Sequence, residues 1–270
     1  KAFAAERAMS EHAYQNPEKK PANGKSVCVI GAGPGGLSAA YYLALMGYRV
    51  KVIEALPMAG GMLMVGIPRY RLPREVIDRE VAMIQDLGVE FLFNTCLGKE
   101  ITMEELQKQG FDAFFIAIGA HRSWQMDLEG ENQFPNVLDA VTFLKDVALG
   151  HRQVPGKNVV VIGGGNVAID AARTCLRLGS KTVTVAYRRS RKQMPADVEE
   201  VEQAEEEGVA FSFLTIPTKI NGQGDTISDL ACIKAELVKK ADTDRLAPVP
   251  IPGKEFSIQA DVVISAIGQY

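Results

Sequence analysis

Two glycine-rich turns carry the spacing most suggestive of chemistry in this sequence. The first, Gly31-Ala32-Gly33-Pro34-Gly35-Gly36, is a GxGxxG pattern between a predicted strand and a predicted helix. In such a turn the first glycine permits a tight bend and the second lets the backbone approach a pyrophosphate. The third allows the helix to pack closely on the strand. Because N–H groups at the start of the helix then face the phosphates, the pattern predicts a dinucleotide site.

An acidic residue supports this interpretation. Glu54 lies 23 residues after Gly31, at the end of the next predicted strand, where a carboxylate can accept hydrogen bonds from a ribose diol. A GxGxxG pattern alone is weak evidence, but strand, turn, helix, strand and terminal acid together are specific. The alternative is a structural glycine turn with a solvent-facing Glu54, and the combined pattern favours the cofactor site.

The second turn is Gly163-Gly164-Gly165-Asn166-Val167-Ala168, in which alanine is an accepted third position. The following strand ends in Arg188 and Arg189 without an acid. A carboxylate would repel a 2′-phosphate, whereas a guanidinium can hold it with two hydrogen bonds. The pattern therefore predicts NADP(H) rather than NAD(H). Alternatively, Arg188–Lys192 is a solvated charge run or a nucleic-acid patch, but its place at the adenosine end of the fold favours the cofactor.

Alternating elements position these turns. The sequence predicts strands at 26–30, 49–54, 89–93, 112–118, 158–162, 182–187, 209–213 and 261–267, with helices at 35–46, 73–88, 166–178 and 196–207. Residues 27–33 are echoed by 159–165, and the strand ending Ala117-Ile118-Gly119 by the one ending Ala266-Ile267-Gly268. We therefore predict an α/β protein with two Rossmann-like dinucleotide-binding domains, in which the sheets are parallel and doubly wound.

The composition excludes several classes of protein. The 270 residues are 47% hydrophobic with a net charge of −3, which argues against nucleic-acid and membrane-surface binding. No apolar run approaches the roughly 18 residues of a membrane span. The four cysteines form no CxxC, so a zinc ribbon, a disulfide framework or an iron–sulfur cluster held by this chain alone is not expected. We expect a reduced, cytoplasmic protein without a metal site, and interpret the acidic run 199–207 as an exposed helix face.

Two dinucleotide sites in one chain imply that hydride passes between two cofactors. If the first site holds FAD and the second holds NADP(H), the transfer requires stacking and distance rather than an acid–base pair. We therefore nominate no catalytic side chain. The expected domains are an N-terminal helix and linker at 1–25, an FAD-binding domain at 26–122 that is rejoined by 261–270, and an NADP(H)-binding domain at 123–260.

Two further stretches carry a family resemblance. Residues 60–73 (Gly-Gly-Met-Leu-Met-Val-Gly-Ile-Pro-Arg-Tyr-Arg-Leu-Pro) and the segment from Tyr187 through Met194-Pro195-Ala196 to Glu200 resemble the small (beta) subunit of NADPH-dependent glutamate synthase. Related flavin domains, such as that of dihydropyrimidine dehydrogenase, share the first signature. The resemblance extends from about Lys1 to Gly268.

The resemblance implies a two-dinucleotide-binding-domain flavoprotein, in which hydride passes from NADPH to FAD and electrons then pass to iron–sulfur clusters or a partner subunit. Carried over by position, the residues that hold FAD are Gly31, Ala32, Gly33, Pro34, Gly35, Gly36, Glu54, Gly61, Arg71 and Leu97. Those that hold NADPH are Gly163, Gly164, Gly165, Asn166, Arg188 and Arg189, with Ala266, Ile267 and Gly268 near the nicotinamide.

The sequence departs from the family at both ends. The family has cysteine-rich cluster ligands ahead of the N-terminal helix and a Gly-Asp segment after the second Ala-Ile-Gly. We therefore expect a fragment with an incomplete FAD site, iron–sulfur clusters only outside it, and an electron-accepting subunit or domain as partner. A homo-oligomer is also compatible with the sequence. The alternatives are an NADP(H)-binding or assembly fragment without turnover and a thioredoxin reductase-like flavoprotein, which the lack of CxxC disfavours.

Overall fold

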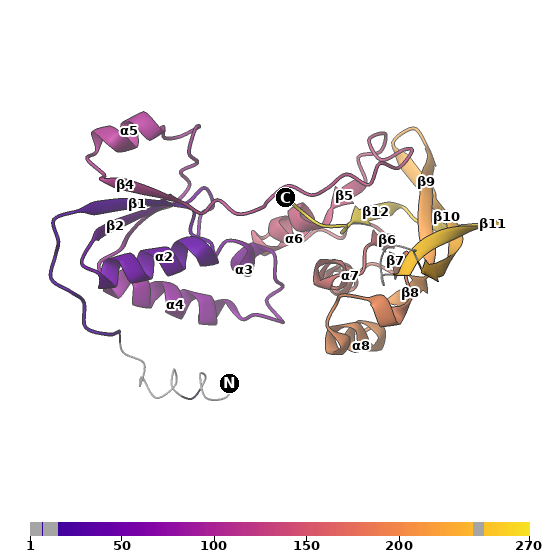
Figure 1. Cartoon of the computed structure of the whole chain (residues 1–270). Coiled ribbons are helices and arrows are strands. Elements are labelled where there is room, and N and C mark those ends of the chain that lie inside the picture. Colours follow the sequence, from indigo (N-terminus) through magenta and orange to yellow (C-terminus); the bar gives the residue numbers. More distant parts are fainter. Residues whose placement is uncertain (1–6, 8–15, 240–245) are drawn as a thin grey trace. The chain divides into compact units, whose positions relative to one another are not determined.

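The computed structural model describes Arg7 and residues 16–239 and 246–270. The chain divides into two compact units (Figure 1). Unit 1 comprises the chain up to Met64 together with Arg69–Gly119, and unit 2 comprises Val65–Pro68 and Ala120–Tyr270. Apart from Arg7, the helix predicted within residues 1–15 lies outside the described residues. The predicted α/β fold with parallel sheets is confirmed in both units.

Unit 1 is a parallel sheet with the strand order β3-β2-β1-β4. Helices α2 and α4 lie on one face, and Leu106 of α5 packs with the core residues Cys28, Ile30 and Ile53 on the other (Figure 1). The central strand β1 is wholly buried because both faces are covered. The strands are β1 Ser26–Ile30, β2 Arg49–Ile53, β3 Glu90–Leu92 and β4 Ala113–Ile116, and the helices are α2 Pro34–Leu45, α3 Met62–Val65, α4 Arg74–Asp86 and α5 Met103–Lys108.

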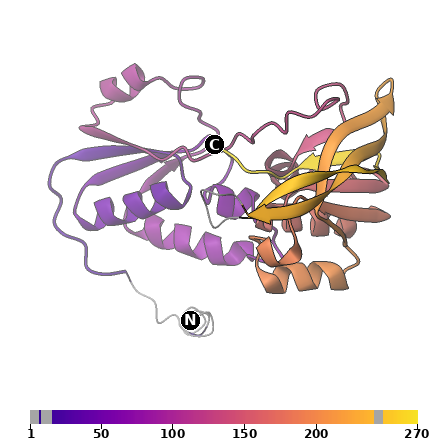
Figure 2. The ribbon, with the colours of Figure 1, turned by 45° about the vertical axis from the view of Figure 1, so that its right-hand side comes forward.

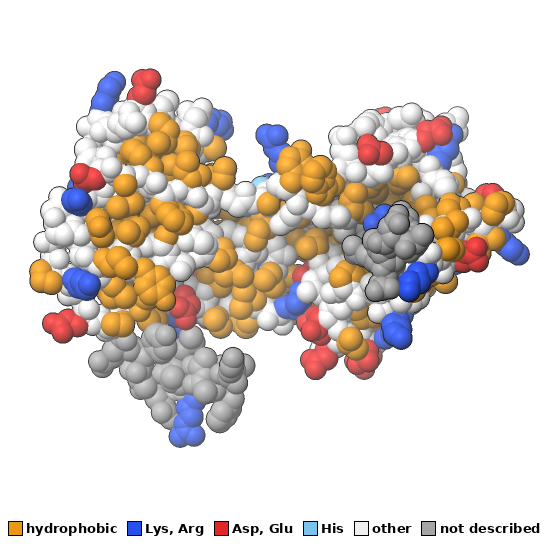
Figure 3. Space-filling view, viewed as in Figure 1, with side chains coloured by type: hydrophobic (Ala, Val, Ile, Leu, Met, Phe, Trp, Pro, Cys, Tyr) orange, Lys and Arg blue, Asp and Glu red, His pale blue; other side chains and the backbone are white. Residues whose placement is uncertain are grey.

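Helix α2 is apolar well beyond its buried face. Figure 3 shows hydrophobic side chains over the part of unit 1 that contains this helix. Tyr42 on the helix and Met46 directly after its last residue are each more than half exposed. The helix therefore shows little of the two-sided periodicity of an ordinary surface helix. Its position in the sequence follows from the glycine turn before it and Gly47 after it.

Unit 2 contains a parallel sheet with the order β5-β12-β6-β7-β8 and an antiparallel sheet with the order β11-β10-β9. Helices α6, α7 and α8 pack on one face of the parallel sheet, and apolar residues of β9 and β10 pack on the other (Figure 2). The elements are β5 Val137–Asp139, α6 Ala140–Ala148, β6 Asn158–Ile162, α7 Asn166–Leu178, β7 Thr182–Tyr187, a 3₁₀ turn at Arg191–Gln193, α8 Val198–Glu206, β8 Ala210–Phe213, β9 Thr215–Gln223, β10 Thr226–Lys239, β11 Leu246–Gln259 and β12 Val262–Ser265.

The structure differs from the sequence analysis at three places in unit 2. The segment 261–270 is predicted to rejoin the first domain, but Val262–Ser265 pairs with β5 and β6 in the middle of the second sheet. Strand β5 and helix α6 are not predicted. The sequence also predicts a strand at 256–259, whereas β11 begins earlier, at Leu246. The run Asn221-Gly222-Gln223-Gly224-Asp225 predicts a hairpin turn, and the structure has a hairpin there, with Gly224 and Asp225 as its two turn residues between Gln223 and Thr226.

A buried arginine joins α7 to α8. The side chain of Arg173 is 4% exposed and forms ion pairs with Glu200 and Glu207, and Glu207 also accepts a hydrogen bond from Arg177 at 2.6 Å. Burial raises the pKa of Glu207, but hydrogen bonds from Arg177 and Arg173 outweigh it and lower that pKa to about 2. The acidic run of α8 is thus not only the exposed face that the sequence suggests, because two of its carboxylates fasten the helix to α7.

Glu207→Ala is expected to lower the free energy of unfolding by about 2–3 kcal/mol at neutral pH, since it leaves a buried guanidinium with one partner fewer. Because the pKa of Glu207 in the folded chain lies below the ordinary glutamate value of 4.5, this stabilisation is present above pH 4.5 and declines as the pH falls from 4.5 towards 2. Urea unfolding at several pH values measures both effects. The exposed neighbour substitution Glu206→Ala should change stability by less than about 0.5 kcal/mol, and an equal loss in both variants would contradict the assignment.

Candidate functional site

The first glycine turn joins β1 to α2 in unit 1. Gly31 has φ +104°, and a Cβ there would collide with the carbonyl oxygen of Ala117. A Cβ at Gly36 would likewise collide with the carbonyl oxygen of Gly31, so both glycines are required by the fold. Gly33 differs, because the nearest atom to its added Cβ would be the Cα of Gly61 at 3.9 Å. The backbone at the start of α2 is therefore left open, as a pyrophosphate would need.

Two further predicted residues lie against this turn. The carboxylate of Glu54, only 7% exposed, accepts hydrogen bonds from the N–H of Ala32 at 2.6 Å and of Leu56 at 2.8 Å. The Gly60–Gly61 segment is also held there, since the Gly60 N–H donates to the carbonyl of Ala32 at 2.8 Å. Glu54 and Gly61 are thus brought to the glycine turn, with the carboxylate stabilising its conformation.

The two remaining residues that the resemblance assigns to the first site lie in other segments of unit 1. Leu97 forms a bridge with Ile101 after β3 and packs beside the core residue Leu106. Arg71 is half-buried in the segment between α3 and α4. Their roles remain predictions.

The second glycine turn joins β6 to α7 in unit 2. Added Cβ atoms would collide with the carbonyl oxygen of Ala266 at Gly163 and with the ring of Tyr187 at Gly164. At Gly165 the added Cβ meets no atom of the described chain within 4 Å. The next residue, Asn166, accepts a hydrogen bond from the N–H of Asp197 at 2.9 Å and so ties the α8 end of the following loop to the turn. Gly165 therefore leaves open space at the start of α7, as Gly33 does at α2.

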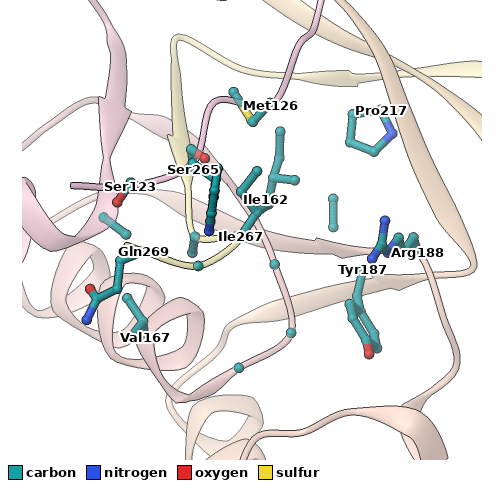
Figure 4. Close-up of a pocket in the computed structure, with 18 of the residues that line it drawn as sticks. Ser123, Met126, Ile162, Val167, Tyr187, Arg188, Pro217, Ser265, Ile267 and Gln269 are labelled. Carbon is teal, nitrogen blue, oxygen red and sulfur yellow. The ribbon is translucent and has the colours of Figure 1, made fainter. Parts of the chain in front are cut away.

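The second turn forms the floor of a pocket of about 740 Å³ in unit 2 (Figure 4). The pocket lies at the carboxyl ends of β6, β7 and β12, which is where ligands bind to open parallel sheets. All nine residues that the sequence analysis places at the NADPH site line it, namely Gly163, Gly164, Gly165, Asn166, Arg188, Arg189, Ala266, Ile267 and Gly268. The volume is in the range of a pocket for a small organic ligand.

The polar groups of this pocket suit an anionic ligand. Among the residues that the structure describes, its lining includes two arginines and no carboxylate. The Nε of Arg189 is buried and has no hydrogen-bond partner among the described residues, and the same holds for the hydroxyl of Ser265. Buried polar groups without partners are rare in folded proteins and call for an acceptor or a water molecule. The groups present therefore fit a phosphate-bearing dinucleotide.

The sequence analysis missed several lining residues. Ser123 and Trp124 come from an irregular segment, which pairs with the backbone of Gly268 and Gln269 after β12. No local pattern marks them, because only long-range pairing brings them to the pocket. Ser265 and Tyr187, in contrast, directly precede predicted site residues, and the strand ends could have indicated them.

The cysteines provide no redox pair within the described residues. All four are free thiols, and Cys28, Cys175 and Cys232 are buried. Burial raises the pKa of Cys175 and of Cys232 to about 12, so neither is a thiolate near neutral pH. The described residues also hold no cluster of three or more metal-ligating side chains. None of the described helices combines the length and hydrophobicity needed to cross a membrane.

Both glycine turns lie within the part of the chain that matches one protein family. The pyridine nucleotide-disulphide oxidoreductase family matches residues 25–270. The chain belongs to this family. Membership confirms the predicted oxidoreductase class, and it confirms a pyridine nucleotide and FAD as the cofactors of the family in which this chain is placed.

Two curated relatives are named as a subunit and as a small chain. The chain is 46% identical over 257 residues to the NADPH-Fe(3+) oxidoreductase subunit beta of Geobacter sulfurreducens, which covers 93% of this chain and 38% of the relative. It is 36% identical over 256 residues to the glutamate synthase [NADPH] small chain of Azospirillum brasilense, covering 91% of this chain and 53% of the relative. The predicted resemblance is confirmed, and the chain spans between about a third and a half of these relatives.

The fold is also shared with a solved oxidoreductase. The structure of Mycobacterium tuberculosis FprA in complex with NADPH is similar with a TM-score of 0.77 and 20% identity. The match covers 93% of this chain and 71% of FprA. At this identity the likeness supports the fold alone, and it agrees with the predicted pair of dinucleotide-binding domains.

Proposed function

We propose that this chain is the NADPH-oxidising flavoprotein module of a larger enzyme, with unit 1 as the FAD-binding domain and unit 2 as the NADP(H)-binding domain. When both cofactors are bound, they supply the chemistry, in which a hydride from NADPH reduces FAD. The observation that carries the proposal is the pocket of unit 2, where a glycine turn and two arginines meet and no carboxylate of the described part of the chain lines the wall.

In this proposal, the residues of this chain bind and orient the two cofactors. In unit 1, the open backbone at Gly33 and the first N–H groups of α2 would hold a pyrophosphate, and Glu54 would accept hydrogen bonds from a ribose. In unit 2, Gly165 and α7 would do the same for NADPH, while Arg188 and Arg189 would hold its 2′-phosphate. No side chain is assigned a proton transfer.

The electrons leave through a partner. Two relatives are named as a beta subunit and a small chain, which supports a partner subunit or domain as the electron acceptor. We propose iron–sulfur clusters of the full-length protein, or a partner subunit, as that acceptor, and a reducing compartment such as the cytoplasm as the location. An NADP(H)-binding fragment without turnover is the second candidate.

An anaerobic absorbance titration tests the proposal. The purified chain is loaded with FAD and then titrated with NADPH or NADH. We expect a bound-flavin spectrum that NADPH bleaches faster than NADH does. A chain that binds NADPH but never FAD supports the second candidate, and a folded chain that binds neither would refute the proposal.

Gly33→Val is expected to weaken FAD binding by about 100-fold or more, because its side chain fills the open space at the start of α2. Flavin fluorescence during FAD titration measures this loss. The affinity of the same variant for NADP⁺ should stay within about twofold of the wild-type value, since the substitution lies in unit 1. Unchanged flavin affinity would count against the first site.

A further inference from the structure

An exposed aromatic pair lies at one end of the unit 2 pocket. Trp124 and Tyr270 are 56% and 55% exposed, and their ring centroids lie 4.5 Å apart. Trp124 lines the pocket, and so does the exposed apolar side chain of Ile267. Large apolar side chains gathered at a pocket mouth are typical of a binding surface rather than of a solvated one.

The backbone fixes this pair in place. The N–H of Trp124 donates to the carbonyl of Gly268 at 3.0 Å, and the N–H of Tyr270 donates to the carbonyl of Arg122 at 2.7 Å. Gly268 has φ +121°, and a Cβ there would lie 3.5 Å from the indole ring. The indole thus stands beside the strand end at which β12 leaves the sheet.

The strand order shows which part of a dinucleotide would meet this pair. In the order β5-β12-β6-β7-β8, the arginines follow β7 on one side of β6, and Ile267 follows β12 on the other. Figure 4 shows Arg188 and Ile267 at separate places around the turn. With the pyrophosphate at Gly165 and the 2′-phosphate at the arginines, the other half of the nucleotide extends over β12.

We propose that Trp124, supported by Tyr270, forms the wall against which the nicotinamide half of NADP(H) packs. An indole offers a flat apolar face to a planar ring. The buried hydroxyl of Ser265, which has no partner among the described residues, lies at the end of the same strand β12 and offers a hydrogen bond to a carboxamide. This inference rests on the proposed function, because it requires NADP(H) in this pocket.

Adenosine 2′,5′-bisphosphate lacks the nicotinamide half of NADP⁺. Comparing the affinities for the two ligands therefore distinguishes the contributions of the two ends of the pocket. Measured by calorimetry, Trp124→Ala should lower the affinity for NADP⁺ about tenfold and leave that for the bisphosphate within about twofold. Trp124→Phe, which keeps a ring, should lose no more than about threefold for NADP⁺. Val249→Ala, at an exposed apolar site on β11, serves as the matched control and should change neither affinity.

Fluorescence gives a second readout. Trp124 is the only tryptophan of the sequence, so its emission should fall on binding of NADP⁺ and remain unchanged on binding of the bisphosphate. If the wild-type chain binds both ligands but Trp124→Ala weakens both equally or neither, the wall is refuted while the proposed function stands. If the folded wild-type chain binds neither ligand, both proposals fail.

Discussion

Gly165→Val is expected to lower the affinity for NADP⁺ by about 100-fold or more while unit 2 remains folded. No atom of the described residues lies within 4 Å of the added Cβ, so the fold accommodates the side chain. Gly165 has φ −93° and ψ 175°, which a β-branched residue adopts without strain. The space that valine fills is the one through which a pyrophosphate would approach the start of α7, and overpacking it costs about 3 kcal/mol.

The neighbouring glycine provides the contrast. At Gly164 the added side chain would collide with the ring of Tyr187, so Gly164→Val should lose stability and binding together. Gly165→Val should lose binding, with only the roughly 1 kcal/mol that a poorer residue costs at the start of a helix. Calorimetric titration with NADP⁺ and thermal unfolding separate the two. Wild-type affinity in Gly165→Val would show that no pyrophosphate lies at this turn.

Gly33→Val is the counterpart of Gly165→Val in the other unit. The two open glycines occupy equivalent places in the two units, each directly before a helix that follows the first strand of the motif. If unit 1 holds FAD and unit 2 holds NADP(H), Gly33→Val should weaken the binding of FAD alone. Gly165→Val should weaken the binding of NADP(H) alone. Loss of both cofactors in either variant would point to a folding defect instead.

The local parts of this fold follow from the sequence because short-range rules decide them. Gly31 and Gly36 are required by backbone contacts within the turn itself, and the capping box at Thr102 and Glu105 forms as its spacing indicates. The strand, turn, helix and strand around each glycine turn are predicted correctly for this reason. The same holds for the pocket residues that lie next to the second turn in the sequence or directly after β7.

Long-range pairing decides the parts that sequence reasoning missed. Strand β12 is buried along its whole length and apolar up to Ser265, and such a run fits the middle of any parallel sheet. Only its registry with β5 and β6 places it in unit 2. Strand β5 is three residues long and shows no periodicity, although Asp139 caps the helix that follows it by accepting from the Thr142 N–H at 2.7 Å. Trp124 reaches the pocket through the same kind of distant pairing, with Gly268.

Replacing Arg188 and Arg189 together by alanine is expected to lower the affinity for NADPH by about 10- to 100-fold and the affinity for NADH by less than about threefold. Charge-assisted hydrogen bonds to a phosphate contribute about 1–3 kcal/mol, and NADH has no 2′-phosphate to receive them. Arg188 is exposed at the pocket, and the buried Nε of Arg189 has no partner among the described residues. Both guanidiniums thus have hydrogen-bonding capacity that a phosphate can use.

Arg191→Ala is the matched control for the loss of a positive charge. Arg191 follows in the same basic run but forms an ion pair with Glu205 at 2.5 Å and does not line the pocket. Its removal should weaken both coenzymes equally and slightly, through the general field alone. If the double variant also lost equal affinity for NADPH and NADH, the arginines would act through that field too, and the selectivity for the 2′-phosphate would have to come from another group.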